Sequence, residues 1–97
     1  MKEVFLVSKE NKNKALDKLK NDDRISRGSI VLREAKALGI EENGFFLAID
    51  CDEHDVKRAI EILKDLAHVY KHKEKVLEKI EEQEENAIQG FGNILGF

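Results

Sequence analysis

Hydrophobic and polar positions alternate in blocks along the chain, and the spacing within each block predicts an element of secondary structure. The first block, EVFLVS, has four consecutive apolar residues between polar ones, which indicates a buried strand. In the following NKNKALDKLK, Ala15, Leu16 and Leu19 have helical spacing, and Asn11 is available as an N-cap. We therefore expect a strand and then a short helix with a narrow apolar stripe and a lysine-rich opposite face.

The pattern at residues 30–38 allows two interpretations. SIVLREA predicts a strand with Ile30 and Leu32 on one face and Val31 and Ala35 on the other. Alternatively, VLREAKALG could be a helix that ends at Gly39. We favour a strand to about Ala35, followed by a loose loop through LGIEENG.

The next segments predict a strand and a long helical region. Apolar residues alternate along GFFLAIDC with a period of two, which is typical of a strand. Asp52 then predicts a helix start, with Asp55 completing an acidic capping box. Apolar residues recur at a spacing of three or four over residues 56–70, and the pattern resumes from Val76 to Ile88 after KHKEK. No Pro or Gly lies between residues 51 and 89, so we expect one long helix, or two helices with a bend near 71–75.

This order predicts an α+β protein with a ferredoxin-like split β-α-β-β-α layout, about three antiparallel strands, and a C-terminal helix or helix pair. We expect a single domain, with an α+β core in residues 1–70 and a helical extension with an apolar, glycine-rich tail in residues 71–97. Helices on one face would leave the other face of the sheet open. That face would include some of Phe5, Val7, Val31, Phe46 and Ala48. The C-terminal helix and tail, or a second copy, would have to cover it.

One segment carries a resemblance to known domains. GFFLAIDCDEHDVKRAIEILKDL resembles the closing strand, acidic turn and xVxxAxxxL helix of small ferredoxin-like domains. The overall layout also resembles small uncharacterised archaeal proteins of about this length. The likeness covers about a quarter of the chain and is a packing pattern, so it implies a fold and no activity.

Composition and charge narrow the classes of partner. The 97 residues are 41% hydrophobic and 38% charged, which indicates one globular domain with a heavily charged surface. Lys and Glu dominate that surface, as in thermophile proteins, although the absence of Pro argues against this interpretation. The net charge is −3, with basic blocks in residues 1–27 and 56–80 and acidic blocks in 28–55 and 81–97. Complementary blocks favour folding or self-association over nucleic-acid binding, which would concentrate one sign. We expect no nucleic-acid partner.

The single cysteine, Cys51, excludes an intramolecular disulfide and is typical of a reducing cytosol. The apolar stretch VFLV near the start is too short for a signal peptide or a membrane span. We therefore expect a cytoplasmic protein without a membrane partner.

Several residues could suggest metal or catalytic chemistry. Cys51, His54, His68 and His72 superficially resemble a zinc-ligand set. If residues 53–70 form one helix, however, His54 and His68 would lie about 21 Å apart and could not share one ion. DCDEHD lacks the glycine and distal glutamate of a calcium loop. Acidic neighbours would raise the pKa of the Cys51 thiol and disfavour a nucleophile. We expect no cofactor, no metal and no catalytic residue.

Two segments remain as candidate sites. The first is a basic loop with Arg24, Arg27 and Ser29 around Gly28, and Arg33 downstream, which could bind an anion. The second is the tail AIQGFGNILGF, whose apolar residues predict an interface: Ile88, Phe91, Ile94, Leu95 and Phe97. The three glycines of the tail disfavour a regular helix, so we expect an irregular turn that docks on the sheet of this chain or of a partner.

These patterns predict a non-catalytic, homo-oligomeric binding or scaffolding module. The alternative is a regulatory domain that binds a small anion or nucleotide through the arginine loop. The tail could also bind a different, unidentified protein.

Overall fold

The computed structural model describes the backbone of residues 1–94 and the side chains of residues 1–84. Within this part of the chain, the strands are β1 (Lys2–Val7), β2 (Ser29–Glu34), β3 (Phe45–Asp50) and β4 (Ala67–Val69). The α-helices are α1 (Lys12–Lys20), α2 (Glu53–Leu63) and α3 (Lys73–Ile94), and two short 3-10 helices are η1 (Ile25–Arg27) and η2 (Lys36–Leu38).

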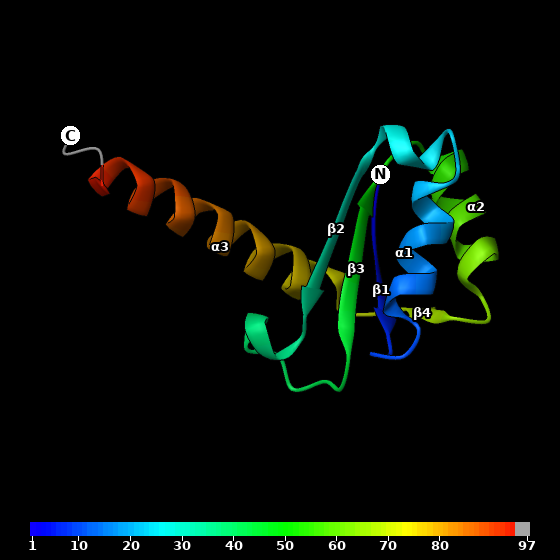
Figure 1. The fold of residues 1–97 in the computed structure, drawn as a ribbon, viewed down its shortest axis with the longest axis horizontal. Coiled ribbons are helices and arrows are strands. Elements are labelled where there is room, and N and C mark those ends of the chain that lie inside the picture. The colour runs from blue at the N-terminus through cyan, green and yellow to red at the C-terminus, as the bar shows by residue number, and fades with distance from the viewer. Residues whose placement is uncertain (95–97) are drawn as a thin grey trace.

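The four strands form one antiparallel sheet in the order β2-β3-β1-β4 (Figure 1). Lys2 of β1 lies opposite Asp50 of β3, and Phe5 lies opposite Val69 of β4. The prediction of an α+β protein is confirmed. The prediction of about three strands is wrong, because β4 adds a fourth on the outer side of β1.

The missed strand lies where the sequence predicted continuous helix. The helix expected over residues 53–70 ends at Leu63, and residues 67–69 pair with β1. The Tyr70 backbone N–H donates to the Val4 carbonyl, and Ala67 is buried in the core beside α2. Without β4, the free edge of the central strand β1 would expose unpaired backbone groups, so this tertiary pairing outweighs the helical spacing. Ile60, which belongs to the apolar pattern of residues 56–70, is 37% exposed.

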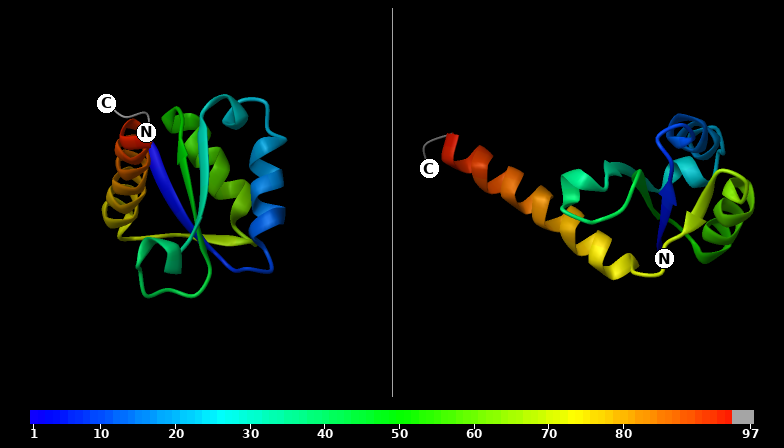
Figure 2. Two further views of the ribbon diagram at one scale, coloured as in Figure 1. Left: turned by 60° about the vertical axis from the view of Figure 1, so that its left-hand side comes forward. Right: turned by 90° about the horizontal axis from the view of Figure 1, so that it is seen from below.

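Helices cover both faces of the sheet (Figure 2). On one face α1 and α2 enclose a core that includes Phe5, Val7, Leu19, Leu47, Ile49, Val56 and Leu63. On the other, α3 and the segment around η2 enclose a second core of Val4, Ala35, Leu38, Ile40, Phe46, Ala48, Val76 and Ile80.

The second face is covered by α3, one of the two covers considered from the sequence, and three of the five residues considered for it lie there. Val31, Phe46 and Ala48 do lie on the face away from α1 and α2. The assignment of Phe5 and Val7 to that face is wrong, because the two-residue period of β1 turns them towards α1 and α2.

Residues 30–38 begin as a strand, as favoured from the sequence, and β2 ends at Glu34. The following segment is not a loose loop, since η2 forms and Leu38 and Ile40 are buried in the second core. Gly39 and Gly44 adopt positive φ angles of 71° and 119°. At Gly44 an added Cβ would lie 2.5 Å from the Val7 carbonyl oxygen, so glycine allows this turn to pass close to β1.

Helix α3 starts over β1 and crosses the second face towards β2. Val76 and Ile80 are buried in its first turns, and the Gln83 side-chain amide donates to the Ala37 carbonyl at 2.7 Å. Beyond this contact the helix leads away from the sheet (Figure 1). Two helices form, as one alternative predicted, but the bend expected near residues 71–75 is wrong, because residues 64–72 separate the helices and include β4.

The predicted tail falls largely outside what the structure describes. The irregular turn is wrong as far as Ile94, because α3 continues to that residue. The side chains of Ile88, Phe91 and Ile94, and all of Leu95 and Phe97, lie outside the described part of the chain.

Candidate functional site

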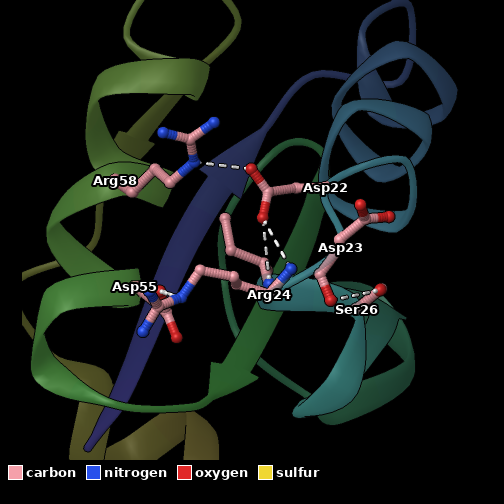
Figure 3. A network of polar contacts seen from close by, with 7 residues as sticks. Asp22, Asp23, Arg24, Ser26, Asp55 and Arg58 are labelled. Carbon is pink, nitrogen blue, oxygen red and sulfur yellow. Dashed lines mark hydrogen bonds and ion pairs between the residues drawn. The ribbon is translucent and has the colours of Figure 1, made fainter.

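The arginine loop packs against α2 through two ion pairs (Figure 3). Arg24 Nε lies 3.0 Å from Asp55 Oδ1, and Arg58 Nε lies 2.6 Å from Asp22 Oδ2. The two carboxylate side chains are only 9% and 8% exposed. The predicted capping box is wrong, because Asp52 makes no side-chain capping bond to α2 and Asp55 bonds Arg24 instead.

Asp22 organises the start of this loop. Its second carboxylate oxygen accepts the backbone N–H groups of Arg24 and Ile25 at 3.0 and 3.1 Å. The hydrogen bond from Arg58, and then that from the Ile25 backbone, lower the pKa of Asp22. The same hydrogen bond, donated to Asp22, raises the pKa of Arg58. Asp22 therefore links the turn before η1 to the middle of α2, a structural role for charges in this loop.

The four predicted anion ligands are not brought together. Arg24 is directed at α2, and Arg27 is exposed at the end of η1. Side chains alternate along a strand, so Ser29 and Arg33 lie on the same face of β2 as Val31, which is the face away from α1 and α2. Arg33 donates to the neighbouring Leu32 carbonyl at 3.0 Å. Anion binding by this set stays a prediction that the geometry does not favour.

A hollow beside the loop has mixed charge. It is lined by Arg24, Arg27, Gly28, Cys51, Asp52 and Asp55. Two carboxylates oppose the two guanidinium groups, so the lining offers no net positive field to an anion. A Cβ at Gly28 would collide with the Asp50 carbonyl oxygen, so this glycine is needed for close packing of the loop on β3.

The cysteine and histidines are spread over the molecule. Cys51 follows β3, and His54 is exposed in the first turn of α2. His68 is in β4 and His72 precedes α3, so these two histidines do not lie on one helix. Among the described residues no three His, Cys, Asp or Glu side chains are grouped to hold a metal ion.

The Cys51 thiol is packed at the edge of the core beside α2. Burial, and then the charge of Asp55, raise the pKa of this thiol. The direction agrees with the sequence-based expectation, although burial is the larger cause. A thiol with a raised pKa is a poor nucleophile at neutral pH.

Two surface features were missed by sequence reasoning. The Tyr70 ring packs against the Phe46 ring in a tilted arrangement, with centroids 4.8 Å apart, and the Tyr70 hydroxyl donates to Glu42 Oε2 at 3.0 Å. A groove also runs between α3 and the β2–β3 side of the sheet, with Val31 and Leu77 among its lining residues. Both depend on the position of α3 over the sheet, which no local pattern in the sequence specifies.

Comparisons with protein-family models, curated proteins and solved structures gave no match to this chain. The resemblance to small archaeal proteins therefore stays a prediction. In the described residues, no helix combines the length and the apolar character that crossing a membrane requires.

Proposed function

We propose that this protein is a non-catalytic, homo-oligomeric binding and scaffolding module in which α3 is the assembly element. The observation that carries this proposal is the course of α3, which crosses the second face of the sheet and then continues beyond it (Figure 1). The helix is 22 residues long, and the hydrogen bond from Gln83 to the Ala37 carbonyl lies at its midpoint.

The second half of α3 gives the physical reason for a partner. From Glu85 to Ile94 the helix is about 15 Å long, at roughly 1.5 Å per residue. A helical segment this short is marginal in water without tertiary packing. The sequence in and after this segment supplies the apolar residues predicted as an interface: Ile88, Phe91, Ile94, Leu95 and Phe97. A second copy would offer apolar surface to the same stretch of helix.

We also infer that the domain belongs to the ferredoxin-like group of folds. The element order β-α-β-β-α-β and the placement of β3 and β1 between their neighbours support this assignment. A cytoplasmic location is part of the same proposal and rests on the single cysteine.

Multi-angle light scattering of the full chain and of residues 1–86 tests the proposed function. We expect the full chain to be a dimer or larger, and removal of residues 87–97 to lower the association state or the melting temperature. A second variant keeps the full length and replaces Phe91 and Phe97 with Ser. It should have the same effect as the truncation. If the full chain is monomeric at all concentrations, or if neither change has an effect, the proposal is wrong.

A further inference from the structure

Strand β2 forms one outer edge of the sheet and carries apolar residues there. It pairs only with β3 within the described residues. Ile30, Val31 and Leu32 are each only partly buried, whereas the facing residues of β3 are buried. An edge strand of this length and composition is a template for pairing with another strand.

The backbone polarity of β2 follows from its pairing. The Ala35 N–H donates to the Gly44 carbonyl at 3.0 Å, which continues the β2–β3 register by one residue. Hydrogen-bonded pairs alternate in an antiparallel ladder, so residues 29, 31 and 33 bond β3. The N–H and C=O groups of Ile30 and Leu32 therefore point to the open edge. The Arg33 guanidinium reaches the Leu32 carbonyl, as expected for an acceptor that β3 leaves free.

We propose that β2 pairs antiparallel with β2 of a second copy, joining the two sheets into one of eight strands. This inference rests on the proposed self-association and identifies the surface that performs it. Residues whose backbone N–H and C=O groups point to the open edge must lie opposite each other in the joint, so Ile30 faces either Leu32 or Glu34 of the second copy. The first register sets apolar residues opposite each other and Val31 opposite itself, whereas the second sets Glu34 against Ile30. Cross-strand pairing energies select the first.

Charge complementarity supports the antiparallel orientation. Arg27 is exposed immediately before β2, and Glu34 is exposed at its end. Neither side chain has an ion-pair partner among the residues that the structure describes. In the selected register Gly28 faces Glu34 of the second copy, which brings Arg27 next to that carboxylate. The two-fold axis makes this contact twice, and such rim pairs fix orientation more than they add affinity.

The course of α3 fits the same arrangement. Strand pairing over six residues buries less than the roughly 800 Å² per partner of a stable interface. Glu84 of α3 lines the groove together with Ser29 and Val31 of β2, so the helix reaches this edge before it leaves the sheet. A two-fold axis perpendicular to the sheet puts both α3 helices on one face, where each would extend over the other copy.

Sedimentation velocity of charge-exchange variants tests the pairing. Arg27→Glu and Glu34→Arg should each weaken the dimer about tenfold, because each places two like-charged contacts in the interface. The double variant should return to within about threefold of the unmodified chain. Lys20→Glu is the matched control for Arg27→Glu, since Lys20 is exposed on α1 and its replacement makes the same change in net charge.

Cysteine crosslinking tests the register in a Cys51→Ser background. Val31→Cys should give a covalent dimer on oxidation, because facing non-hydrogen-bonded residues have Cα atoms about 4.5 Å apart, within disulfide range. Leu32→Cys should not, since those Cα atoms would lie about 7–8 Å apart on a diagonal. Crosslinking at Leu32 and not at Val31 would overturn the register.

The remaining outcomes separate the two proposals. A chain that is monomeric throughout overturns both. A chain that self-associates and depends on residues 87–97, but neither responds to the charge exchanges nor crosslinks at Val31, overturns the β2 pairing alone.

Discussion

Replacement of Ile80 by Ala tests whether α3 is part of the folded core. Ile80 is 6% exposed and packs in the second core with Val4 and Phe46. The substitution deletes three carbon groups at about 0.8 kcal/mol each, and the cavity left behind adds about 0.5–1 kcal/mol. We therefore expect a loss of about 3 kcal/mol in the free energy of unfolding. This is a large share of the roughly 5–15 kcal/mol typical of a domain.

Ile60→Ala is the matched control. Ile60 is also a helical isoleucine, in α2, but it is 37% exposed, so the gain in helix propensity is similar and the loss of burial is smaller. We expect a cost below about 1 kcal/mol there. Urea unfolding followed by circular dichroism measures both variants, at one protein concentration. In thermal melts the Ile80 variant should fall by about 12–24 °C.

Equal losses in the free energy of unfolding at the two positions would contradict the core role of Ile80. They would mean that the first turns of α3 contribute little to stability and that the second face of the sheet has another cover. A large loss at Ile80 alone would show that α3 is integral to the domain.

Three further predictions follow from local features. Asp22 has a lowered pKa, so its contribution to stability is complete above the usual aspartate pKa of about 3.9 and is lost as pH falls through the folded-state pKa. Asp22→Asn should lower the free energy of unfolding at pH 7 and flatten the acid side of its pH dependence. An unchanged acid side would contradict the role of Asp22. Gly44→Ala should destabilise more than Gly39→Ala, because both have positive φ but only Gly44 approaches the Val7 carbonyl; urea midpoints would rank the two, and the reverse order would be inconsistent with this turn. The Cys51 thiol should react with iodoacetamide at pH 8 more slowly than free cysteine, since its pKa is raised; a faster reaction would exclude a buried, inert thiol.

Elements with a self-contained pattern were predictable from the sequence. The VFLV run identified β1, the two-residue alternation in GFFLAIDC identified β3, and the stripe from Val56 to Leu63 identified α2. In each case the residues that face the core are specified by neighbours a few positions away. The sequence of β2 allowed a strand or a helix, because its residues are only half-buried and carry a weaker pattern.

Elements that depend on distant partners were not predictable. Ala67 continues the helical spacing of α2, and only the free edge of β1 makes its segment a strand. Asp22 and Arg58 are 36 positions apart in the sequence, so their ion pair could not be predicted locally. For this reason the arginine loop was interpreted as a ligand site, although Asp22 and Asp55 form ion pairs that hold it against α2. The choice between an open and a covered second face required the path of α3.

The central position of β1 has a consequence for synthesis of the chain. Its first neighbour, β3, is complete only at Asp50, and its second, β4, only at Val69. Among the described strands only β2 and β3 are consecutive in the chain and paired, so this hairpin can form before β1 has any place to dock. Because synthesis adds about 5–20 residues per second, β1 stays unpaired for several seconds after it leaves the ribosome. During that time the exposed VFLV segment of the nascent chain depends on protection from aggregation.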